Sequence, residues 1–135
     1  MNLTLSDAFD RFQAKPKNRY SSLSAIAADG AMVIACTSTY FNHPTRGVLR
    51  YEDRLSREAP ESKESKLLGE HLILARDGEL PIRMIVVAAS TDKTDGRSVH
   101  VRPDLLGKLI KFDGDHYVVD FTRPDADVKP KHTRK

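Results

Sequence analysis

The sequence predicts an α+β domain: one small domain with a mixed or mostly antiparallel sheet of six to seven strands, one main helix packed on it, and a short N-terminal helix. Two apolar runs are each divided by an Asp-Gly pair, at 29–30 and 113–114, a pattern typical of β-hairpins. A third stretch, 60–76, carries apolar residues at helical spacing. The resulting order of elements, α-β-β-β-α-β-β-β-β, is that of an α+β fold.

Composition places the chain among globular proteins, because 39% of its residues are apolar and 30% are charged. Its 135 residues suit one ordinary domain, which we place at residues 1–123. The longest apolar run, 84–89, is far shorter than the roughly 20 residues of a membrane-spanning helix. The N-terminus has neither the basic start nor the long apolar segment of a signal peptide, so a cytoplasmic location is expected.

Two helices are expected. The first occupies part of residues 3–13, with Ser6 as its N-cap and with Phe9 and Phe12 directed to the core. The main helix is expected over 60–76, where a proline and acidic residues open the helix and a glycine follows its end. The face expected to pack on the sheet comprises Leu67, Leu68, His71, Leu72 and Ala75.

The two hairpins set a strand register if each Asp-Gly pair forms a two-residue type I′ turn. Small apolar residues on both faces of the first hairpin predict that it lies in a sheet covered on both sides. The expected opposing pairs are Ile26 with Val33 in the first hairpin, and Ile110 with Tyr117 and Leu106 with Phe121 in the second.

Three further strands are predicted between the hairpins. Residues 47–53 place Arg50 and Glu52 on one face and Tyr51 on the other, and neither face is purely apolar, which is typical of an edge strand. The nearly continuous apolar run 80–90 predicts the central strand. A short strand is expected at 98–102.

The net positive charge resides in the C-terminal tail. The chain carries a formal charge of +3, and residues 123–135 alone account for it with five basic and two acidic side chains. Residues 124–135 have no apolar periodicity, so we expect a disordered basic tail. Within the body, residues 1–57 carry +3 and residues 58–122 carry −3, an asymmetry that permits a positive face.

Common catalytic and cofactor motifs are absent from the sequence. Cys36 is the only cysteine and lies in an apolar run, where a thiol usually acts as a small core residue. The five histidines show no metal-binding spacing, so no metal site is expected. Glycine-rich phosphate loops and the Gly-x-Ser-x-Gly elbow are missing too, so no cofactor is expected.

The distribution of basic residues favours an accessory domain that binds nucleic acid or a nucleic-acid-associated protein. Arginine makes bidentate contacts with phosphate, and exposed aromatic rings stack on bases. The alternative for residues 43–58 is a solvated charged edge, in which Arg50 and Arg54 pair with neighbouring acids. The candidate binding residues are Arg11, Lys15, Lys17, Arg19, Arg46, Arg50, Tyr51 and Arg54.

Two other functions stay open. A metal-independent ribonuclease or toxin-like phosphodiesterase needs only a base, an acid and cations; here its candidates are His43, Arg50 and Glu52, with His100 or His116 recruited from elsewhere. A protein-interaction subunit, such as a homodimer, would pair through the predicted edge strand 47–52. The missing motifs favour binding over catalysis.

Overall fold

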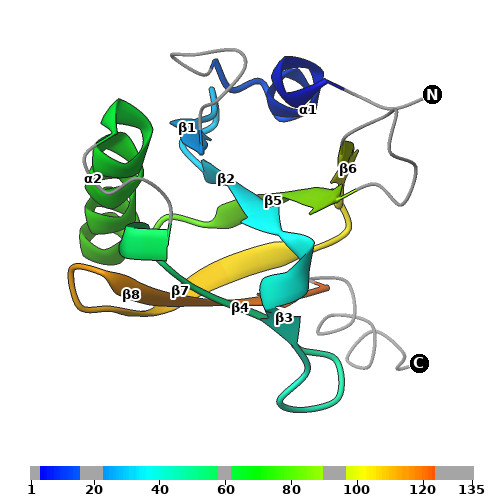
Figure 1. Cartoon of the computed structure of the whole chain (residues 1–135), viewed down its shortest axis with the longest axis vertical. Helices are drawn as coiled ribbons and strands as arrows, with labels where there is room; N and C mark the ends of the chain where they lie inside the picture. Colours follow the sequence, from blue (N-terminus) through cyan, green and yellow to red (C-terminus); the bar gives the residue numbers. More distant parts are fainter. Residues whose placement is uncertain (1–3, 16–22, 58–61, 90–96, 124–135) are drawn as a thin grey trace, which may run out of the picture.

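The structure of the protein, a computed structural model, describes residues 4–15, 23–57, 62–89 and 97–123 (Figure 1). Two α-helices and eight strands form one small α+β domain, as predicted, with one strand more than the expected six to seven. The elements are α1 (Leu5–Arg11), β1 (Ser24–Ile26), β2 (Met32–Thr37), the 3₁₀ turn η1 (Ser38–Tyr40), β3 (Phe41–Asn42), β4 (Leu49–Arg54), the 3₁₀ turn η2 (Leu55–Arg57), α2 (Lys63–Gly78), β5 (Ile82–Ala89), β6 (Arg97–Val101), β7 (Leu106–Phe112) and β8 (His116–Thr122).

All eight strands belong to one mixed, mostly antiparallel sheet. Its order is β1-β2-β5-β7-β8-β4-β3, and β6 pairs with β5 outside this path. The pairing of β2 with β5 is parallel, and every other pair is antiparallel. The Tyr51 hydroxyl of β4 accepts a hydrogen bond from the backbone N–H of Thr37, at the end of β2. The sheet therefore curves enough to bring β4 back to β2.

The two faces of the sheet hold two hydrophobic clusters. Along β2, Ile34 belongs to the larger cluster, which the apolar face of α2 completes, whereas Val33 points to the smaller cluster under α1. In Figure 1, α2 stands at one side of the sheet and α1 lies across β1, β2 and β6. The expectation that the first hairpin is covered on both faces is confirmed.

Both helices begin at a residue other than the one expected. Thr4 rather than Ser6 caps α1: its side chain accepts from the Asp7 N–H, and the Asp7 side chain accepts from the Thr4 N–H. Ser62 caps α2, whose first residue is Lys63. Phe9 is buried, as predicted, and Phe12 packs partly buried against the smaller cluster. On α2, Leu68, Leu72 and Ala75 of the expected face belong to the larger cluster, whereas Leu67 belongs to neither cluster.

The register predicted for both hairpins is wrong. The first turn holds three residues, with Gly30 at φ +91° and the Ala27 N–H bonded to the Ala31 carbonyl, so the loop is one residue longer than a type I′ turn. The second turn occupies 113–115, where the Asp113 carboxylate accepts from two backbone N–H groups. The observed pairs include Ala25 with Val33, Ile26 with Met32, Phe112 with Tyr117 and Gly107 with Phe121.

A β-bulge in β7 also changes the register of the second hairpin. The register shifts between Leu109 and Lys111, and the intervening Ile110 is half exposed. Leu109 packs against the larger cluster instead of Ile110. An extra residue on one strand moves every later side chain by one position, and no turn rule anticipates it.

The predicted edge strand is an interior strand. β4 pairs with β8 over its whole length, and on its other side Arg50 and Tyr51 pair with β3. The prediction was wrong because Tyr51 and Asp53, polar in sequence, point into the core and are 0% and 6% exposed. The described part of the chain contains no helix that is long and apolar enough to cross a membrane.

Candidate functional site

The ends of three strands meet at one corner of the sheet. β4 pairs antiparallel with β8, so the start of β4 lies beside the end of β8, with Leu49 opposite Phe121. β7 also pairs antiparallel with β8, which brings the turn before β7, residues 102–105, to the same corner. The loop that joins β3 to β4, residues 43–48, reaches this corner from the other side (Figure 1).

A pocket of about 650 Å³ lies at this corner, and we call it the arginine pocket. Its cationic side chains come from all three segments: Arg46 from the β3–β4 loop, Arg102 from the turn before β7, and Arg123 directly after β8. His43 joins them from the loop. The lining residues are His43, Arg46, Gly47, Val48, Leu49, Arg102, Leu105, Phe121, Thr122 and Arg123.

The floor of the arginine pocket is apolar. Leu105 and Phe121 are 6% and 0% exposed and belong to the larger hydrophobic cluster, and Leu49 packs against that cluster. Residues of the hydrophobic core thus form the base of the pocket, and charged side chains surround it. None of the described residues that line the pocket is a carboxylate.

Asp104 lies next to the arginine pocket and holds two of its arginines. The Arg102 guanidinium donates two hydrogen bonds to the Asp104 carboxylate, at 3.1 and 3.0 Å, and Arg123 approaches the same carboxylate at 3.5 Å. The hydrogen bond from Arg102 lowers the pKa of Asp104 and raises that of Arg102. Arg46 is exposed and forms no ion pair with any residue of the described ranges.

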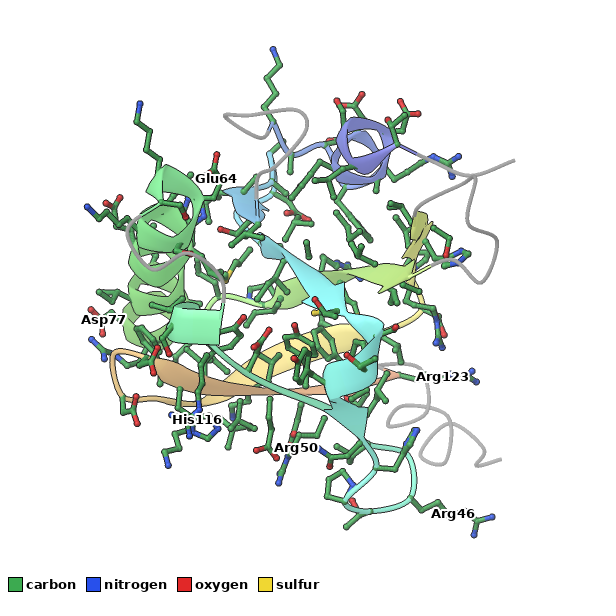
Figure 2. The ribbon with its side chains drawn as sticks, viewed as in Figure 1. Arg46, Arg50, Glu64, Asp77, His116 and Arg123 are labelled. Atoms are coloured by element: carbon green, nitrogen blue, oxygen red, sulfur yellow. The ribbon has the colours of Figure 1, made fainter. Side chains whose placement is uncertain are left out.

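Figure 2 shows Arg46 and Arg123 on the same side of the molecule, away from α2. Arg50 and His116 project from a different face, below β4 and β8. The candidate residues of segment 43–54 therefore divide between two surfaces. His43 and Arg46 line the arginine pocket, and Arg50 and Glu52 do not.

The predicted binding residues of β4 mostly have partners within the protein. Arg50 makes a bidentate pair with Asp120 at 2.7 and 3.0 Å, and this hydrogen-bonded pairing raises the pKa of Arg50. Arg54, which is exposed, lies 3.7 Å from Asp115. Tyr51 has no exposed ring face on which a base could stack.

Tyr51 belongs to a buried polar network instead. Its hydroxyl donates to the Asp53 carboxylate at 2.6 Å and accepts from the Thr37 N–H at 2.9 Å. Burial is the main cause that raises the pKa of Tyr51, and burial with the nearby Asp53 carboxylate raises that of Cys36. Cys36 is thus a buried, neutral core thiol, as the sequence indicated.

The N-terminal basic residues lie apart from the arginine pocket. Arg11 ends α1 and Lys15 is exposed shortly after it, while α1 and the β3–β4 loop occupy opposite ends of the molecule (Figure 1). Lys17 and Arg19 lie outside the described residues, as does the tail from residue 124.

The residues considered for catalysis are not brought together as one group. His43 lines the arginine pocket, whereas Glu52 lies 3.6 Å from His116 Nε2 on the outer face of β4 and β8. His71 Nδ1 is 2.7 Å from the hydroxyl of Ser24, which is buried, so this histidine has a polar partner at the core boundary. Within the ranges that the structure covers, no cluster of His, Cys, Asp and Glu could hold a metal ion.

The sequence interpretation missed Arg102 and Arg123. The signal was available only through strand pairing: Leu49, at the start of β4, pairs with Phe121, so Arg123 follows β8 at the end where the β3–β4 loop enters β4. Without that pairing, Arg102 reads as the end of a strand and Arg123 as the start of the tail.

Comparison with known proteins does not extend these observations. The chain matches no protein-family model, no curated protein and no solved structure. The functional argument therefore depends on the residues themselves.

Proposed function

We propose that the protein binds single-stranded nucleic acid and that a phosphate group binds in the arginine pocket. The observation that carries the proposal is the convergence of Arg46, Arg102, Arg123 and His43, from three separate segments, around an apolar floor. Guanidinium groups form short, bidentate, charge-assisted hydrogen bonds with phosphate oxygens. Three arginines gathered at one site favour an anionic ligand, and Arg46, unlike Arg102 and Arg123, is not paired with Asp104.

The shape of the site favours an unpaired strand. The volume of about 650 Å³ lies within the usual range for small-molecule sites, so one nucleotide fits. An unpaired base can leave its neighbours and lie on the apolar floor that Leu49 and Leu105 provide, whereas a base inside a duplex is stacked and paired. The ligand is therefore expected to be a single strand, or the unpaired end or loop of a longer nucleic acid.

Fluorescence anisotropy with labelled oligothymidylate and oligouridylate tests the proposal. The wild type should bind with a strong salt dependence, because each phosphate contact on a single strand contributes about −0.7 to the slope of log K against log salt. Arg46→Ala/Arg123→Ala should weaken binding at least about tenfold and make the slope shallower by roughly 1.4. Lys63→Ala/Arg76→Ala, two exposed cations on α2, is the matched control and should change little.

Two results would contradict the proposal. One is wild-type affinity no better than about millimolar at low salt, weaker than ordinary non-specific nucleic-acid binding. The other is an equal loss of affinity in the arginine-pocket variant and in the α2 control.

A metal-independent ribonuclease is the second candidate, supported by the contact between Glu52 and His116 at 3.6 Å beside Arg50. A carboxylate and an imidazole can act as the base and the acid, and a guanidinium can stabilise the negative charge that develops in cleavage through the RNA 2′-hydroxyl. This function predicts RNA cleavage in EDTA that is lost in His116→Ala. Cleavage at the wild-type rate in that variant would remove this candidate.

A further inference from the structure

A second, smaller pocket lies against the C-terminal end of α1. It has a volume of about 340 Å³, and its lining residues come from α1, the first hairpin, β5 and the turn before β7. Two of them are arginines, Arg11 and Arg83, and one is the acid Asp29. The Asp29 carboxylate accepts a hydrogen bond from the Ala31 N–H, so one of its oxygens serves the hairpin turn. We call this site the α1 pocket; its lining residues are Arg11, Phe12, Gln13, Asp29, Arg83 and Pro103.

The two pockets are neighbours. Arg102 lines the arginine pocket and the next residue, Pro103, lines the α1 pocket. Consecutive Cα atoms are about 3.8 Å apart, so the turn at Arg102 and Pro103 contributes to the lining of both pockets. The Arg83 guanidinium donates a hydrogen bond to the Pro103 carbonyl at 3.3 Å. This bond links β5 to the turn between the two pockets.

Cationic side chains therefore follow one another across the turn before β7. Arg46 and Arg123 lie on the arginine-pocket side, Arg102 lies at the boundary, and Arg83 and Arg11 lie on the α1-pocket side. Among the acids near this path, Asp104 pairs with Arg102, and Asp29 accepts a hydrogen bond from the Ala31 N–H of the hairpin turn. In Figure 1, α1 and the β3–β4 loop lie at opposite ends of the molecule. The turn at 102–105 lies between their basic residues, because it contributes lining residues to both pockets.

We infer that the nucleic acid does not end in the arginine pocket but crosses the turn at Arg102 and Pro103 and continues into the α1 pocket. This inference rests on the proposed function, and it names the ligand class as an extended single strand rather than a mononucleotide. Regularly spaced phosphates suit cations distributed over two adjoining sites, whereas a single phosphate needs only one. Small single-strand-binding domains commonly cover about 4 to 16 nucleotides.

Length dependence tests this inference separately from the proposed function. The probes are a labelled thymidine dinucleotide and an oligothymidylate of about 12 nucleotides. The wild type should bind the longer probe more tightly per site and with a steeper salt slope. Arg11→Ala/Arg83→Ala should bind the dinucleotide within about twofold of wild type, yet bind the longer probe about tenfold more weakly, with a slope shallower by roughly 1.4.

Two controls keep the result interpretable. Arg83 bonds to the turn, so a thermal melt of each variant checks that the fold is retained. Arg11→Ala alone, at the exposed end of α1, should remove about half of the change in slope without touching that hydrogen bond.

The outcomes separate clearly. Dinucleotide binding that depends on Arg46 and Arg123, together with an unchanged length dependence in Arg11→Ala/Arg83→Ala, would overturn the inference and leave the proposed function standing. Absence of wild-type binding to both probes would overturn the proposed function and the inference with it.

Discussion

Both halves of segment 43–54 carry arginine, but their arginines have different surroundings. The loop half places His43 and Arg46 on the rim of a pocket, and Arg46 has no ion-pair partner in the described part of the chain. The strand half pairs Arg50 with Asp120 and buries Tyr51 against Asp53. The arginine of the loop half therefore makes no ion pair with the described residues, whereas Arg50 of the strand half is paired with an acid of the protein.

Within segment 43–54, strand pairing rather than charge density decides which cations form ion pairs inside the protein. A residue on β4 has a neighbour on β8 at a fixed register, and at Arg50 that neighbour is an acid. Arg46, in the β3–β4 loop, has no cross-strand partner of this kind. The arginine pocket is accordingly built from loop, turn and strand-end residues.

The largest expected effect is a loss of stability, and it comes from Tyr51 in the strand half of the segment. Tyr51→Phe removes one donated and one accepted hydrogen bond from a site that is 0% exposed, so the free energy of unfolding should fall by about 1 to 3 kcal/mol. Urea denaturation measures this loss. The nucleic-acid affinity of the folded variant should stay unchanged. Wild-type stability with weakened binding would instead place Tyr51 in the binding site and contradict its structural role.

The pairing of Arg50 with Asp120 should have a smaller effect. The pair is bidentate and its side chains are 31% and 20% exposed, so a double-mutant cycle with Arg50→Ala and Asp120→Ala should give a coupling energy of about 1 kcal/mol. Chemical denaturation of the four proteins provides the values. A coupling energy near zero, with lower nucleic-acid affinity in Arg50→Ala, would place Arg50 in the binding surface instead.

The smallest expected effect concerns Asp104, which occupies the guanidinium groups of Arg102 and Arg123. Asp104→Asn removes a negative charge beside the arginine pocket and should raise nucleic-acid affinity about two- to fivefold, as expected for exposed pairs. Asp77→Asn, at an exposed pair on α2, is the matched control for net charge. Weaker binding in Asp104→Asn alone would show that Asp104 orients the arginines for the ligand rather than competing with it.

Local patterns predicted the element types but not how the strands meet. The helical spacing of Leu68, Leu72 and Ala75 and the apolar run of β5 gave the main helix and the central strand correctly. Both Asp-Gly hairpins formed, yet their registers were wrong because longer turns and a bulge at Ile110 shift the pairing. Such shifts depend on packing between segments far apart in sequence.

The candidate site was predicted only in part for the same reason. His43 and Arg46 begin a charge-rich segment, 43–58, and the structure places both at the arginine pocket. Arg102 and Arg123 join them only because β7 and β8 begin and end at that corner. Tyr51 is a candidate for base stacking by residue type, but its ring is buried in the larger hydrophobic cluster, beside Phe41 and Tyr117.

The central claim is that nucleic acid binds at the corner where β4, β7 and β8 meet, and amide chemical shifts during titration with an oligothymidylate test it most directly. The account predicts the largest shifts at residues 43–49, 102–105 and 121–123, with smaller shifts at the end of α1 and the first hairpin turn, and with α2 unchanged. Shifts concentrated on α2, or on the outer face of β4 and β8 around Glu52 and His116, would contradict it.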